Sequence, residues 1–128
     1  MQLKSLVTAA GLIAASAACA DDLMSRLETA QVAIDGRMFV LMGADPALAL
    51  WSPDRRAAST CALRELEARR GRKTAETYVR NVEKAVAEAA GLRSAGEFGG
   101  LAARIHSASG LRMNRDLVPI TQTCGIGL

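Results

Sequence analysis

Cys61 and Cys124 are the two residues of this sequence with the clearest chemistry. A third cysteine, Cys19, lies in a segment that is expected to be cut away or acylated, so two thiols remain in the folded chain. Two thiols in an exported protein most often form a disulfide, because the compartment is oxidising. Closing so long a loop stabilises the fold by roughly 4 kcal/mol when chain entropy alone is counted. We predict a Cys61–Cys124 disulfide, with two buried thiols or pairing between chains as the alternatives.

His106 is the only imidazole of the chain, and Ser107 and Ser109 follow it closely. Nucleophilic catalysis needs such a base within reach of a Ser, Thr or Cys side chain. No Gly-x-Ser-x-Gly elbow accompanies the histidine, and helical geometry places it at the edge of an apolar face. We therefore predict no catalytic residue. An enzyme with a site around His106 and Asp35 is kept as the weaker alternative.

Candidate metal ligands are few. Metal sites need clustered His, Cys or carboxylate groups, and the sequence lacks a Cys-x-x-Cys pair, which also excludes a c-type haem attachment. Met38 and Met42 lie one helical turn apart, and thioethers do bind copper, but such a pair is typical of core filling. Asp35 is embedded in an apolar stretch and is expected to pair with Arg37 or with a neighbouring helix. We predict no metal and no cofactor.

The segment RELEARRGRK crowds cations at the end of a predicted helix and in the loop after it. Four of its residues are candidate contacts for an anionic partner: Arg69, Arg70, Arg72 and Lys73. Complementing the dipole of the helix end is the simpler explanation for such cations. The functional alternative is binding to an anionic envelope component, such as a lipid headgroup or an acidic protein face. No aromatic residues are interleaved to stack bases, so we expect no nucleic-acid partner.

The first twenty residues, MQLKSLVTAAGLIAASAACA, resemble a targeting segment. Lys4 precedes an apolar run over residues 6–15, and Ala18 and Ala20 provide the small residues that a signal peptidase needs before Asp21. The run is too short and too rich in alanine for a bilayer-spanning helix. We therefore predict a cleaved secretory signal peptide over residues 1–20 and a periplasmic or secreted mature chain without a membrane span.

Two other outcomes are open for this segment. Ser16–Cys19 is similar to the lipobox of bacterial lipoproteins, which would leave the chain lipid-anchored through Cys19, although Ser16 stands where an aliphatic residue is usual. The segment could also stay uncleaved as an anchor. The protein leaves the cytosol in all three cases.

Residues 21–128 have the length of one ordinary domain. Without Lys4 the net charge would fall from +3 to +2, too near neutrality to indicate nucleic acid or an acidic substrate. Strand patterns are nearly absent, whereas helical spacing of apolar residues recurs. The spacing and the capping residues predict four long helices and a short one, within residues 22–43, 46–50, 53–71, 74–91 and 94–110. Beyond Gly110 we expect a possible helical turn, then an extended tail.

The predicted fold class is therefore all-α: a small helical bundle of about four helices plus a short one, with an extended C-terminal tail tied back by one disulfide. No motif indicates a family. The predicted function is that of a non-catalytic exported binding or accessory protein of the bacterial cell envelope. A small periplasmic stress or chaperone-like protein is the alternative, and an enzyme with a site near His106 is weaker.

Overall fold

The computed structural model describes residues 10–128, with side chains from Asp22 onwards, and every regular element in that range is helical. The five α-helices are α1 (Ala10–Leu41), α2 (Pro53–Arg70), α3 (Arg72–Gly91), α4 (Phe98–Ala108) and α5 (Val118–Cys124). Two 3₁₀ turns, η1 (Pro46–Ala49) and η2 (Ala95–Glu97), and one π-helical turn, η3 (Met113–Leu117), lie between them. The prediction of an all-α bundle is confirmed.

Local capping residues set several helix ends. The Ser52 hydroxyl accepts a hydrogen bond from the Arg55 amide at 3.1 Å, and Pro53 occupies the first turn of α2, where its missing N–H is not needed. Gly71 alone separates α2 from α3, and its φ of +88° is a conformation that glycine adopts without strain. Ser94 and Glu97 form the predicted capping box before α4.

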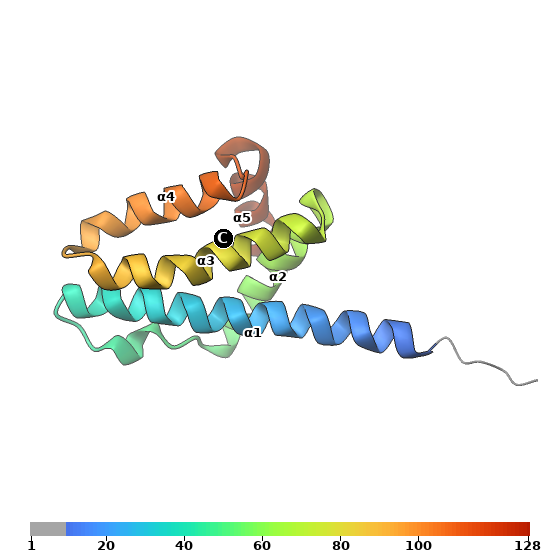
Figure 1. The fold of residues 1–128 in the computed structure, drawn as a ribbon, viewed down its shortest axis with the longest axis horizontal. Helices are drawn as coiled ribbons and strands as arrows, with labels where there is room; N and C mark the ends of the chain where they lie inside the picture. The colour runs from blue at the N-terminus through green and yellow to red at the C-terminus, as the bar shows by residue number, and fades with distance from the viewer. Residues whose placement is uncertain (1–9) are drawn as a thin grey trace, which may run out of the picture.

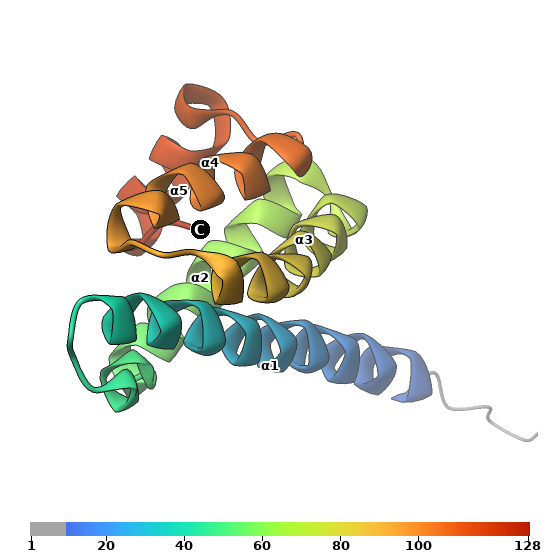
Figure 2. The ribbon, with the colours of Figure 1, turned by 60° about the vertical axis from the view of Figure 1, so that its left-hand side comes forward.

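Helix α3 is the central element of the bundle. It packs against α1, α2 and α4, and Figure 1 shows α3 lying between α1 and α4. The view in Figure 2 confirms that α1 runs along one side of the body formed by the other helices. The buried face of α3 is an apolar stripe of Ala75, Tyr78, Val79, Val82, Ala85 and Ala89, and Val86 beside it is partly buried against the core.

The N-terminal part of α1 extends beyond the other helices (Figures 1 and 2). The predicted signal peptide, residues 1–20, includes this part of α1. Residues 1–9 of the signal peptide lie outside the described residues. Its cleavage between Ala20 and Asp21, at the site formed by Ala18 and Ala20, stays a prediction. Within residues 10–128, none of the helices combines the length and the apolarity that a bilayer span requires.

The C-terminal segment differs from the expected extended tail, because it is helical through Cys124. Pro119 is compatible with this helix because it lies in the first turn of α5, where proline removes no helical hydrogen bond. Leu117 and Ile120 are buried against the core at 7% and 0% exposure, which favours a helix that presents both inward. The prediction of an extended tail was therefore wrong for residues 118–124.

The disulfide itself is confirmed. Cys61 and Cys124 are joined, with their Cα atoms 5.6 Å apart, and the bond connects the middle of α2 to the end of α5. Both residues are only partly buried, so the crosslink lies at the flank of α2 rather than in the centre of the core.

Removing the crosslink is expected to lower the stability of the fold. We predict that Cys61→Ser/Cys124→Ser decreases the free energy of unfolding by about 2–4 kcal/mol, because the unfolded chain regains the freedom of a long open loop. Urea unfolding of the oxidised wild type and of the double variant measures this difference. The reduced wild type is the control and should unfold near the variant; equal midpoints for all three samples would contradict the prediction.

Candidate functional site

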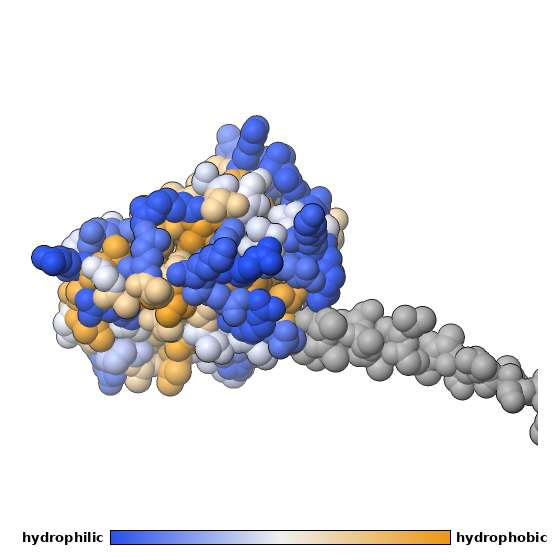
Figure 3. Space-filling view, viewed as in Figure 1, coloured by the Kyte–Doolittle hydropathy of each residue, from blue (hydrophilic) through white to orange (hydrophobic). Residues whose placement is uncertain are grey.

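The four predicted cations lie where α2 ends and α3 begins. Arg69 and Arg70 form the last turn of α2, and Arg72 and Lys73 form the first turn of α3, so Gly71 alone separates the two pairs. Figure 3 shows hydrophilic atoms gathered over this end of the body. The turn at Gly71 therefore concentrates charges that a continuous helix would distribute around its axis.

Asp116 brings two more arginines to this corner. Asp116 is a buried residue, 1% exposed. Its carboxylate accepts hydrogen bonds from the Arg112 amide at 2.9 Å and from Arg115 Nε and Nη2 at 3.0 and 2.9 Å. Arg70 Nη1 approaches the same carboxylate to 3.6 Å. The hydrogen bonds from Arg112 and Arg115 are local to η3, and the Arg70 contact connects this segment to the end of α2. We call the resulting surface the basic corner, and it consists of Arg69, Arg70, Arg72, Lys73, Arg112 and Arg115.

Sequence reasoning did not identify Asp116, Arg112 or Arg115 as part of this site. The available signal was an acid within the arginine-containing segment LRMNRDL, but nothing local connects that segment to α2. The hydrogen bonds from Arg115 lower the pKa of Asp116, with the Arg112 amide and the charges of Arg115 and Arg70 acting in the same direction and burial opposing them.

Most cations of the corner have a carboxylate neighbour. Arg69 pairs with Glu65 at 3.1 Å, and Arg72 pairs with Glu76 at 3.1 Å and with Glu67 at 3.4 Å. These pairs are at the surface, where they contribute little to stability and remain open to exchange with a partner. In the part of the chain with described side chains, Lys73 and the Arg112 guanidinium have no carboxylate within ion-pair distance.

The corner has a local surplus of positive charge. Its six cations face four carboxylates, Glu65, Glu67, Glu76 and Asp116, so two positive charges are in surplus. That surplus equals the net charge expected for residues 21–128. Next to it, η3 exposes an apolar side chain, Met113, at 62%.

Removing the Asp116 carboxylate should destabilise the corner. We predict that Asp116→Ala lowers the free energy of unfolding by about 2–4 kcal/mol at neutral pH, because buried hydrogen bonds to charged groups are lost. Thermal unfolding at a series of pH values measures this loss of stability. Asp116→Asn is the second variant, because it removes the charge and retains the volume of the side chain.

The pH dependence follows from the lowered pKa of Asp116. The carboxylate stabilises the fold fully above its unfolded pKa near 4, and this contribution is lost as the pH falls through the lower folded value. The wild type and the variant should therefore converge in melting temperature as the pH decreases from about 5 to about 2. A difference that is independent of pH would contradict a role for the charge.

Asp35 and His106, the residues of the weaker catalytic alternative, line one hollow between α1, α3 and α4. Asp35 pairs with Arg55 of α2 at 3.1 Å, which confirms the expected pairing with a neighbouring helix, whereas Arg37 donates to the Leu92 carbonyl. Burial raises the pKa of Asp35 and outweighs the opposing effect of Arg55.

The His106 ring stacks on Tyr78 with centroids 6.2 Å apart, and its Nε2 lies 2.9 Å from the Leu128 main-chain oxygen. Burial raises the pKa of Tyr78 far above its usual range, and the charge of Asp35 adds to this effect. The Ser109 hydroxyl instead donates to the Ile105 carbonyl and accepts from Asn81. No hydrogen bond joins a serine to His106 among the described side chains, so the structure does not bring a nucleophile and base together there.

The methionine pair is divided between two environments. Met38 packs against the core, whereas Met42 lies beyond the end of α1 and is 60% exposed. Within the described residues, no three His, Cys, Asp or Glu side chains are grouped so that they could hold a metal ion.

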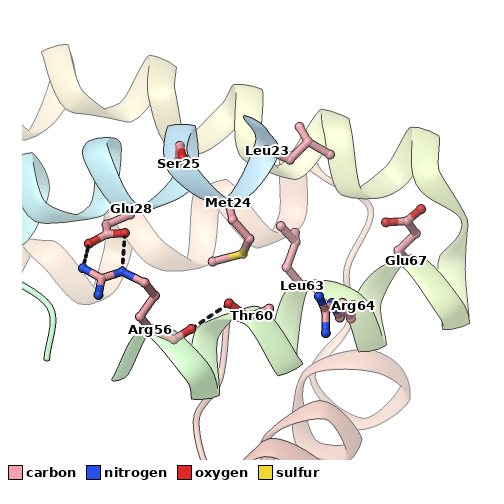
Figure 4. Close-up of a pocket in the computed structure, with 9 residues that line it drawn as sticks. All are labelled: Leu23, Met24, Ser25, Glu28, Arg56, Thr60, Leu63, Arg64 and Glu67. Carbon is pink, nitrogen blue, oxygen red and sulfur yellow. Dashed lines mark hydrogen bonds and ion pairs between the residues drawn. The ribbon is translucent and has the colours of Figure 1, made fainter. Parts of the chain in front are cut away.

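A second hollow of about 300 Å³ lies between α1 and α2 (Figure 4). Leu23, Met24 and Leu63 form its apolar part. At its rim Arg56 donates two hydrogen bonds to Glu28, at 2.5 and 2.9 Å, so these charged groups are already occupied by each other. The geometry of this groove is that of a helix–helix seam closed by an ion pair.

No protein-family model matches this chain, and no curated protein or solved structure is significantly similar to it. Any functional assignment therefore depends on the residues and their arrangement.

Proposed function

We propose that this chain is an exported, non-catalytic accessory protein of the bacterial cell envelope that binds an anionic membrane surface through the basic corner. The observation that carries the proposal is the clustering of six cations from three separate segments at one end of the bundle. The signal-like first twenty residues and the Cys61–Cys124 disulfide support an oxidising compartment outside the cytosol.

A lipid surface fits this corner better than an acidic protein face does. Clustered Lys and Arg side chains are each attracted to anionic headgroups by about 1 kcal/mol near the surface. Met113 and Val118, 62% and 37% exposed, lie next to the arginines on η3 and at the start of α5. Cations beside exposed apolar side chains are typical of peripheral binding at the headgroup boundary.

The binding test reverses charges that do not hold the fold. Arg70 and Arg115 contact the buried Asp116, so changing them would confound binding with stability. We predict that Arg69→Glu/Lys73→Glu/Arg112→Glu weakens binding to phosphatidylglycerol vesicles at least about tenfold, with little change in melting temperature. Vesicle co-sedimentation at low salt measures the binding, which should also decrease as salt is added.

The matched control carries the same change of net charge outside the corner. Arg80→Glu/Lys84→Glu/Arg93→Glu alters three exposed cations of α3 and of the loop after it, and it should retain most of the binding. Met113→Gln should weaken binding to vesicles without altering the charge. Equal binding by both triple variants, or no binding of the wild type to anionic vesicles, would refute the proposal.

Export has its own test. We predict that the native protein purified from its bacterial source begins at Asp21, because the peptidase cuts after Ala20. Mass spectrometry of the intact protein measures this end. An acylated Cys19 at the N-terminus would indicate the lipid-anchored alternative, and a chain that begins at Met1 with two free thiols would contradict export.

A further inference from the structure

The hollow between α1, α3 and α4 has the features of a small-molecule site that is separate from the basic corner. Its volume is about 300 Å³, which is at the lower end of the range of about 300–1,000 Å³ for ligand pockets. Leu128 folds back over α4 and lines one side of it, next to His106. The walls are mainly apolar and are formed by Ile34, Met38, Val82, Phe98, Leu101 and Ile105.

Asp35 presents an acceptor to this hollow. One of its carboxylate oxygens is bound by Arg55, and the other has no hydrogen-bond partner among the described residues. Arg55 does not line the hollow. Its guanidinium lies over the ring of Trp51, 5.3 Å from the ring centroid, and Trp51 is not a lining residue either. Among the lining side chains Asp35 is therefore the one carboxylate, and none is a lysine or an arginine.

His106 is a second polar side chain of the hollow, because its imidazole is part of the lining. Its Nε2 faces the Leu128 oxygen at 2.9 Å, and a main-chain oxygen only accepts, so Nε2 carries the hydrogen. In the neutral ring Nδ1 is then an acceptor. Gln31, which also lines the hollow, makes no side-chain hydrogen bond to any described residue and can either donate or accept.

An apolar chamber with two acceptors, the Asp35 carboxylate and the neutral His106 ring, is complementary to an apolar ligand that carries hydrogen-bond donors and a positive charge. We propose that this hollow binds a small molecule with an apolar body and a single protonated amine. The ammonium group would lie between Asp35 and His106, with the body among the apolar side chains of α1, α3 and α4. A carboxylate ligand would meet the Asp35 carboxylate and would find no lysine or arginine among the lining side chains to bind it, since Arg55 is already paired with Asp35.

The test uses three probes that share one apolar body: hexylamine, 1-hexanol and hexanoate. They are titrated into the isotope-labelled full chain, and amide resonances are followed by NMR. Hexylamine should shift resonances of α1, α3 and α4 around the hollow and bind at least about tenfold more tightly than 1-hexanol. Hexanoate should cause no such shifts. An absence of shifts with hexylamine, or equal affinity for all three probes, would overturn the proposal.

Two variants separate this site from non-specific binding. Ala102 is an exposed residue of α4 that lines the hollow, so Ala102→Trp should fill it and abolish binding, whereas Ala103→Trp, at the next exposed position, should not. Asp35→Asn should remove the preference for hexylamine over 1-hexanol while the apolar body still binds. Persistent hexylamine binding in Ala102→Trp would also refute the site. The triple variant of the basic corner should bind hexylamine normally, because the two sites share no residue.

Discussion

The apolar stripe of α3 is the constraint on which the remaining structure depends. Tyr78, Val79 and Val82 are no more than 2% exposed, and the helices α1, α2 and α4 all pack against α3. Burial of such side chains contributes about 1.5–3 kcal/mol each to the stability of the fold. A displacement of α3 would therefore cost more free energy than a displacement of any helix that packs on it. Both proposed sites follow from the position of α3: the basic corner forms at its N-terminal end, and the hollow forms between α1 and α4 over Tyr78.

Arginine-to-carboxylate pairs connect the helices around this core. Arg26 of α1 reaches Glu83 of α3 at 2.6 Å, Arg56 of α2 reaches Glu28 of α1, and Arg104 of α4 pairs with Glu88 of α3. Most of these groups are exposed, so each pair adds little free energy. Their consistent placement at the helix seams indicates that they favour one register of neighbouring helices over others.

The C-terminal segment is held at two points, and each point serves a different part of the molecule. The disulfide ties the end of α5 to the middle of α2, and Asp116 ties η3 to the end of α2. The second attachment brings Arg112, Met113 and Arg115 beside the cations of α2 and α3. Beyond α5 the chain reaches back to His106 and closes the hollow with Leu128. A membrane-facing corner and a small-ligand site would thus depend on the same segment.

Local patterns were sufficient to predict the helical class, most helix ends and the disulfide. Ser52, Gly71 and the Ser94–Glu97 pair act within a few residues of their position, and the spacing of apolar residues in α3 directly reports its buried face. The two cysteines were predictable because only two remain after the N-terminal segment. Helix α5 was not predicted for the tail. Pro119 has opposite meanings in the middle of a helix and in its first turn, and only the position of the helix start distinguishes them.

Long-range contacts decided the sites. The sequence identified Asp35, His106 and the cations of residues 69–73 as unusual, but it did not show that Asp35 and His106 line one hollow with Tyr78. It also did not show that Asp116, more than forty positions after Arg70, completes the corner. A helical pattern determines which face of a helix is buried, whereas the partner of each polar side chain depends on how the helices pack. The sequence alone therefore determined most of the helices and the crosslink, and the packing of α1, α2 and α4 on α3 determined which charged groups meet.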